Sequence, residues 1–284
     1  MCFPLSGALG YREGMRTVIA SLAVALLLAS PAFAAATPWQ EVAPGTRLRL
    51  ITSDVLDADG TTLVGLDLDM PEGYKTYWRL PGETGIPTQF DTTGSTGVGA
   101  PALEWPFPVA EKIEGFLDYV YHGQTVLPVR LAVKGTSPML EASVAMGVCS
   151  QVCVPIKAHF ALPLSFAAAD PAESIRLKQA ESLVPIPWDR GDPPFEGVAF
   201  DPASAALRLT VTDPHIDPGS IIASTADPTV IFDTPQKSPD GRSFLLPLRA
   251  RDVGSKWAQS PVRLTFMTDK GSYEVSERVT LSKP

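Results

Sequence analysis

Two cysteines, Cys149 and Cys153, are separated by three residues and are the residues best suited to chemistry. A pair this close can form a disulfide, exchange it with other thiols, or bind a soft metal ion through its thiolates. The third cysteine, Cys2, lies in the N-terminal segment and is expected to leave the mature protein with it. The pair is therefore the candidate chemical centre of the mature chain.

The segments on both sides of the pair are predicted to be strands that hold it at the tip of a hairpin. Apolar and polar residues alternate from Leu140 to Met146 before the first cysteine and from Ile156 to Leu162 after the second. A period of two is typical of a strand with one buried face. The same alternation places Lys157 and His159 on the outer face.

The residues alone leave three roles open for the pair. A structural disulfide would close a ring of only five residues, which stabilises a fold by roughly 2 kcal/mol. Thiol–disulfide exchange is the second role, since a short-loop pair at a sheet edge is reachable by other thiols. The spacing differs from the Cys-x-x-Cys motif of thioredoxin-like enzymes. The third role is a Cu(I) site, with Met146, His122 or His159 beside the two sulfurs.

Residues 1–34 predict a secretory signal peptide. Arg16 precedes the apolar run Val18–Ala29, and Ala32–Ala34 supplies the small residues of a cleavage site. The run is shorter than the roughly 18 to 20 residues that a spanning helix needs. Export is expected to place the mature chain in the periplasm, an oxidising compartment where a disulfide can persist.

The charge of the mature chain excludes several classes of function. Without the signal peptide, 21 of the 23 basic and 30 of the 31 acidic residues remain, a net charge of −9. This balance argues against nucleic acid or an anionic membrane as a partner. No Gly-rich phosphate loop leads from a strand into a helix, so no cofactor is expected.

The mature chain is predicted to be all-β, with two β-sandwich domains at 37–166 and 191–284. Many short strands separated by Pro- and Gly-rich loops indicate this architecture. The linker 167–190 contains a predicted short helix, with Asp170 as the N-cap and Pro171 at its first position. We interpret it as a linker helix packed between the two domains. Its expected apolar stripe consists of Ile175, Leu177, Ala180 and Leu183.

Four segments of the first region carry a family resemblance: Gly73–Pro87, Glu104–Pro108, Tyr121–Pro128 and Gly147–Pro155. They resemble the amino-terminal periplasmic domain of DsbD-type thiol:disulfide reductases, and in particular its ScsB branch, where a Cys-x-x-x-Cys-x-Pro form occurs. The resemblance extends over essentially all of Thr37–Phe166, and Phe195–Leu281 is similar to the second β-region of ScsB-type proteins.

The resemblance implies an immunoglobulin-like sandwich whose cysteines alternate between disulfide and dithiol. Such domains accept electrons from a thioredoxin-like donor and pass them to a periplasmic thioredoxin-fold acceptor. The family pattern makes Cys153 the sulfur that the reducing partner attacks and Cys149 the resolving thiol.

The family also covers its cysteines with an aromatic cap loop, which corresponds to about Ile113–Tyr119 here. Phe116 and Tyr119 are the expected cap residues. Tyr77 and Trp78 are expected either to line the site or to pack in the sandwich.

Full-length family members continue into a membrane electron conduit and a thioredoxin-like domain, and neither is present in this sequence. The chain is therefore expected to take electrons from another protein. The alternative is a non-catalytic copper-binding or protein-interaction module. Its candidate ligands are Cys149, Cys153, Met146 and His122.

Overall fold

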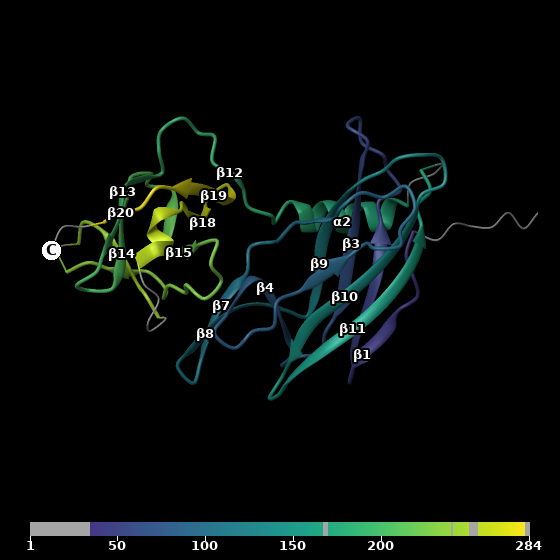
Figure 1. Cartoon of the computed structure of the whole chain (residues 1–284), viewed down its shortest axis with the longest axis horizontal. Coiled ribbons are helices and arrows are strands. Elements are labelled where there is room, and N and C mark those ends of the chain that lie inside the picture. Colours follow the sequence, from purple (N-terminus) through teal and green to yellow (C-terminus); the bar gives the residue numbers. More distant parts are fainter. Residues whose placement is uncertain (1–34, 167–169, 240, 250–254, 282–284) are drawn as a thin grey trace, which may run out of the picture. The chain divides into compact units, whose positions relative to one another are not determined.

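The computed structural model describes residues 35–166, 170–239, 241–249 and 255–281, and the predicted signal peptide lies outside them. The described residues form four β-sheets with one α-helix and a short 3-10 helix (Figure 1). This confirms the all-β prediction. In this part of the chain, no helix has both the length and the apolar character to cross a bilayer.

Two of the sheets pack face to face around a large apolar core. Leu66 of one sheet and Trp78 and Phe160 of the other are fully or almost fully buried there. The first sheet has the order β1 (Gln40–Ala43), β2 (Thr46–Thr52), β3 (Thr61–Asp69), β9 (Gln124–Ala132) and β6 (Ala102–Leu103). The second, which we name the cysteine sheet, has the order β11 (Cys153–Pro163), β10 (Met139–Cys149), β4 (Lys75–Gly82), β8 (Phe116–His122) and β7 (Val109–Ile113), with β5 (Gln89–Asp91) paired to β10.

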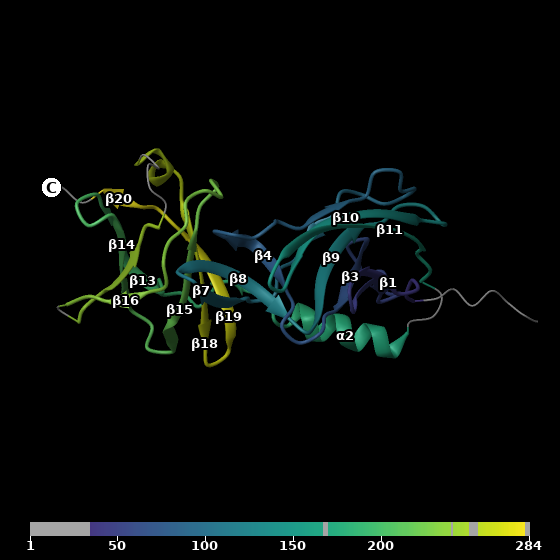
Figure 2. The ribbon, with the colours of Figure 1, turned by 90° about the horizontal axis from the view of Figure 1, so that it is seen from below.

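The helix α2 (Pro171–Glu181) begins as the sequence predicts. The Asp170 side chain accepts hydrogen bonds from the backbone N–H groups of Ala172 (2.8 Å) and Glu173 (3.3 Å). Its predicted role as a linker between two domains stays a prediction. The helix covers the outer face of the first sheet, against β2, β3 and β9 (Figure 2).

The contact between α2 and the sheet depends on a missing side chain in β3. Leu177 is fully buried, and a Cβ added to Gly65 would lie 2.6 Å from its Cδ2 atom. Glycine therefore makes room for the leucine. The predicted apolar stripe is only half right, because Ala180 is also buried whereas Ile175 and Leu183 are exposed.

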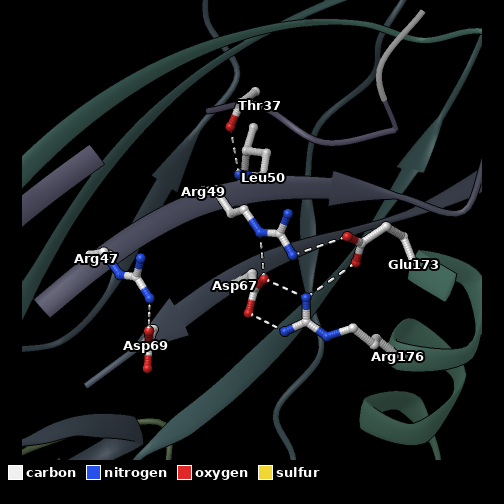
Figure 3. A network of polar contacts seen from close by, with 8 residues as sticks. All are labelled: Thr37, Arg47, Arg49, Leu50, Asp67, Asp69, Glu173 and Arg176. Carbon is white, nitrogen blue, oxygen red and sulfur yellow. Dashed lines mark hydrogen bonds and ion pairs between the residues drawn. The ribbon is translucent and has the colours of Figure 1, made fainter. Parts of the chain in front are cut away.

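An ion-pair network fixes the same helix to the sheet (Figure 3). Asp67 of β3 is completely buried, and its carboxylate accepts from Arg49 Nε at 2.8 Å and from both terminal nitrogens of Arg176 at 2.6 and 2.7 Å. Glu173 accepts from the same two arginines. A buried carboxylate needs such partners, because an unpaired charge is costly to desolvate.

The C-terminal half contains the other two sheets around an aromatic-rich core. Phe195, Phe266 and Trp257 are among its buried residues. One sheet has the order β12 (Ile186–Pro187), β19 (Gly271–Glu277), β18 (Val262–Thr268) and β15 (Ile216–Ser224). The other has the order β16 (Gln236–Lys237), β17 (Phe244–Pro247), β14 (Ala206–Val211), β13 (Phe195–Asp201) and β20 (Thr280–Leu281), and the 3-10 helix η1 spans Ser255–Gln259. The division of the chain into two domains stays a prediction.

Candidate thiol–disulfide site

The two cysteines face each other at the end of a β-hairpin. Cys149 is the last residue of β10 and Cys153 the first of β11, and they occupy opposing positions in the register. Their sulfurs are joined in a disulfide, with a Cα–Cα distance of 4.0 Å. The hairpin expected from the alternating pattern is thus confirmed.

The two cysteines differ sharply in exposure. Cys149 is only 1% exposed and belongs to a small buried cluster with Tyr77 and Val120. Cys153 is exposed, and so are the adjacent Val152 (71%) and Val154 (45%). Thiol–disulfide exchange requires a thiolate to approach one sulfur directly. Of the two cysteines, Cys153 is therefore the more accessible to an incoming thiolate.

The hydroxyl of Tyr77 lies beside both sulfurs. It donates to Cys149 Sγ at 2.9 Å and lies 3.2 Å from Cys153 Sγ. Two glycines make room for the ring, because a Cβ at Gly85 would lie 2.5 Å from Tyr77 Cδ1 and one at Gly147 would lie 3.2 Å from Tyr77 Cε2. Both glycines belong to the segments that carry the family resemblance. One physical function of those segments is thus to admit this tyrosine.

Because side chains alternate between the two faces of a strand, only some of the predicted site residues lie on the same face of the sheet as Cys149. Tyr77 and Cys149 lie on the outer face of the cysteine sheet, whereas Trp78 packs in the core between the sheets. Met146 is also in that core, because an odd number of strand positions separates it from Cys149. The structure therefore does not bring Met146 together with the sulfurs as a copper ligand.

The other predicted copper ligand, His122, makes different contacts. Its Nε2 atom lies 2.8 Å from a carboxylate oxygen of Glu111, and its Nδ1 atom lies 3.0 Å from the carbonyl oxygen of Tyr74. Among the described residues, no group of three or more His, Cys, Asp or Glu side chains is arranged to hold a metal ion. His159, on the outer face as expected, pairs with Glu141.

The predicted cap loop is a tight β-hairpin in this structure. Ile113 and Phe116 are paired, and Glu114 and Gly115 form the turn with positive φ angles of 52° and 87°. Such a turn matches the natural twist of two antiparallel strands. The segment that was expected to be a loop is therefore the end of β7 and the start of β8.

The two expected cap residues lie on opposite faces of β8. Phe116 is half exposed, and its even-numbered position places it on the same face as Val120 and Asp118. Tyr119 is 2% exposed and packs edge-on against Trp78 in the core, with ring centroids 5.9 Å apart. Tyr119 does not meet the expectation of a cap residue, because strand alternation directs it away from the sulfurs. A cap role for Phe116 stays a prediction.

Sequence reasoning missed a group of charged residues next to the disulfide. Lys75 pairs with Cys149 across the strands β4 and β10. Its Nζ atom lies 3.1 Å from Glu111 and 3.5 Å from Asp118, a carboxylate that also accepts from Thr84 Oγ1 at 2.5 Å. These residues come from neighbouring strands that are distant in sequence, so no local motif could have revealed the group.

Two shifted pKa values describe the electrostatics of this group. Burial opposes the charge of Lys75, but the hydrogen bond and the negative charge of Glu111 outweigh it and raise the pKa of the ammonium. Burial also raises the pKa of Tyr77, although Thr84 and the positive charge of Lys75 act against this. The lysine therefore stays charged and the tyrosine hydroxyl keeps its proton at neutral pH.

Comparison with known proteins identifies the class of the first sandwich. Residues 48–165 match the family model described as "Thiol:disulfide interchange protein DsbD, N-terminal". This region therefore resembles the N-terminal domain of DsbD-type thiol:disulfide interchange proteins, and it contains the disulfide between Cys149 and Cys153. The resemblance inferred from the sequence is thereby confirmed.

Among solved structures, the chain is similar to the crystal structure of the N-terminal periplasmic domain of ScsB from Proteus mirabilis. The TM-score is 0.66 at 21% sequence identity, and the similarity covers 87% of this chain and 99% of that one. At this identity the likeness establishes the fold, including the immunoglobulin-like sandwich. No curated protein sequence matches the chain.

Proposed function

We propose that the protein is a periplasmic thiol:disulfide carrier, exported through the signal peptide 1–34, that passes electrons between two thioredoxin-like partners. In this proposal the domain 37–166 holds the chemistry and 191–284 is a second domain. The observation that supports it is the unequal exposure of the two cysteines, because Cys149 is buried and Cys153 is exposed. A purely structural bridge has no need of such an arrangement.

The proposed reduction proceeds in two steps. A thiolate of the donor attacks Cys153 Sγ, the bond to Cys149 breaks, and Cys149 leaves with the electron pair as a thiolate. The second thiolate of the donor then attacks the donor's own sulfur in the mixed disulfide, which releases Cys153. The donor ends as a disulfide, so two electrons have passed to this protein, and the two thiols take their protons from the donor and solvent.

The return of electrons uses the same two sulfurs. The Cys153 thiolate attacks the disulfide of an acceptor and forms a mixed disulfide with it. Cys149 then attacks Cys153 Sγ, which restores the internal disulfide and releases the acceptor as a dithiol. The apolar side chains of Val152 and Val154 flank the reactive sulfur and supply contact area for a partner.

The test is to trap partners with single-cysteine variants in the periplasm. We expect Cys149→Ser to accumulate a mixed disulfide through Cys153, because the resolving thiol is gone. Cys153→Ser is the matched control and is expected to trap little, since its remaining sulfur is buried. Non-reducing gels followed by mass spectrometry of the trapped species measure both.

Two results would contradict the proposal. Trapping by the Cys153→Ser variant alone would reverse the two roles. A reduction potential far below about −300 mV, with no exchange with thioredoxin within minutes, would indicate an inert structural disulfide instead.

A further inference from the structure

We infer that the Tyr77 hydroxyl is a catalytic group of the exchange reaction, which donates a hydrogen bond to the Cys149 thiolate that forms when the disulfide opens. This inference rests on the proposed function and adds a role that neither cysteine can fill. Its basis is the position of the hydroxyl, 2.9 Å from the sulfur that leaves and 3.2 Å from the sulfur that is attacked.

The hydrogen bond becomes stronger during the reaction. A sulfur in a disulfide is a weak, neutral acceptor, whereas a thiolate is a charged one, and hydrogen bonds to ionised groups are about twice as strong. The Tyr77 hydroxyl already lies within hydrogen-bond distance of Cys149 Sγ, so no reorganisation is needed. An interaction that is stronger in the transition state than in the ground state lowers the barrier.

The surroundings of Cys149 make such a donor necessary. The sulfur is almost inaccessible to solvent and lies against Val120, so water cannot stabilise a negative charge there. The cation on the neighbouring strand, Lys75, already faces the two carboxylates of Glu111 and Asp118. That group carries no spare positive charge, whereas a neutral hydroxyl stabilises the thiolate without adding another charge.

The hydroxyl acts as a hydrogen-bond donor and not as an acid. Because burial raises the pKa of Tyr77, a transfer of its proton to the sulfur is unfavourable. The electron pair of the broken bond therefore stays on Cys149 Sγ and the proton stays on Tyr77 Oη. In the return step the same contact favours the Cys149 thiolate, which is the nucleophile that releases the acceptor.

The ring is held so that the hydroxyl can be removed without disturbing the site. Gly85 and Gly147 lie against the ring, and Tyr77 pairs with Val120 across β4 and β8. Phenylalanine has the same ring and fits the same space. Tyr77→Phe therefore tests the hydroxyl alone.

The experiment measures how fast thioredoxin and dithiothreitol reduce the wild type and Tyr77→Phe. We expect about tenfold slower reduction of the variant by both reductants, the size expected for losing a hydrogen bond to a charged group. The matched control is Tyr121→Phe, which removes a buried hydroxyl that donates to the carbonyl oxygen of Pro106 at 2.6 Å on the core face. It is expected to lower stability and leave the rate unchanged.

A pH profile distinguishes this role from a structural one. Cys153 is first converted to a mixed disulfide with glutathione, and the rate at which Cys149 displaces glutathione is followed from pH 5 to pH 10. We expect the profile of Tyr77→Phe to lie at higher pH than that of the wild type. The charged groups that face the site, Lys75 on β4, Glu111 on β7, and Asp118 and His122 on β8, are the same in both proteins.

Incorporation of 3-fluorotyrosine at position 77 provides a second test that keeps the hydroxyl. A more acidic phenol is a stronger donor, so its profile is expected to lie at lower pH than that of the wild type. If Tyr77→Phe and the fluorinated protein both exchange with the wild-type rate and profile, the inference is wrong and the proposed function stands. If the wild type itself exchanges with neither reductant, the proposed function fails first.

Discussion

The two sheets of the cysteine-containing sandwich have outer faces that are covered by the same packing device but for different purposes. On the first sheet, Leu177 of α2 occupies the space left by Gly65. On the cysteine sheet, the Tyr77 ring occupies the space left by Gly147. In each case a strand has glycine where a side chain would collide with a large neighbouring one.

The two covers differ in the polar groups that accompany them. Beside Leu177, the buried carboxylate of Asp67 is fully paired with two arginines and has no reactive neighbour among the described residues. Beside Gly147, the Tyr77 hydroxyl is directed at a bond that can break. Glycine-assisted packing thus stabilises one face and orients a reacting group on the other.

Asp67→Ala is expected to have the largest effect on stability, and this effect is confined to the helix-covered face. The substitution leaves Arg49 and Arg176 without their buried partner, and breaking such a pair costs about 3 kcal/mol of the free energy of unfolding. Urea denaturation measures this loss, and the rate of disulfide exchange is expected to stay at the wild-type value.

The matched control lies two residues further along the same strand. Asp69 pairs with Arg47, but their side chains are 27% and 50% exposed, so Asp69→Ala is expected to cost no more than about 1 kcal/mol. Equal losses for the two variants would show that the buried network does not hold the helix. A slower exchange in Asp67→Ala would show that the two faces are coupled.

Two glycine substitutions test whether the packing at Gly65 affects stability alone and the packing at Gly147 affects the exchange reaction as well. In Gly65→Ala the new Cβ would lie 2.6 Å from Leu177 Cδ2, and in Gly147→Ala it would lie 2.8 Å from the Cβ of Ile86 and 3.2 Å from the Tyr77 ring. Each overpacked site is expected to lose about 1 to 3 kcal/mol of stability. Only Gly147→Ala is expected to slow exchange as well, because it displaces the Tyr77 ring. Thermal unfolding and stopped-flow reduction measure the two effects, and slowed exchange in Gly65→Ala would contradict the assignment.

The cysteine hairpin could be predicted from the sequence because its information is local. Strict alternation on both flanks of Cys149 and Cys153 determines the strands, their inner faces and the exposed tip. The start of α2 is local too, since Asp170 bonds to the next turn of its own helix. The position of α2 on the sheet could not be predicted in this way. It depends on the space at Gly65 and the charge of Asp67, which form a binding surface for the helix only when β2, β3 and β9 are assembled.

The parts of the site that sequence reasoning missed depend on strand order. β4 shows no simple alternation, because Thr76, Tyr77 and Trp78 are all buried between the core on one side and covering residues on the other. Its place between β10 and β8 brings Tyr77 to the sulfurs. The choice between Phe116 and Tyr119 needed the register of β8, where an odd shift reverses the face of every side chain.

The smallest effect concerns pH and is expected on the helix-covered side of the sandwich. Burial, followed by the negative charge of Asp170 at the start of α2, raises the pKa of Asp54 to about 6 from its ordinary value of 3.8. The fold thus favours the protonated carboxyl. Stability is expected to fall as pH rises from about 4 to about 6, where the unfolded chain is ionised and the folded one is not, and to stay lower above pH 6.

Asp54→Asn removes this titration while keeping the shape of the side chain. Its φ of 53° also suits asparagine, which tolerates the left-handed region well. We expect the variant to be more stable than the wild type by about 1 kcal/mol at pH 7, a value reduced by solvent screening of a half-buried group, and equally stable near pH 3.5. Urea denaturation at both pH values measures the difference. An equal gain in stability at both pH values would mean that the effect comes from the backbone and not from the charge. A changed rate of disulfide exchange would show that the helix-covered face and the cysteine-containing face are coupled.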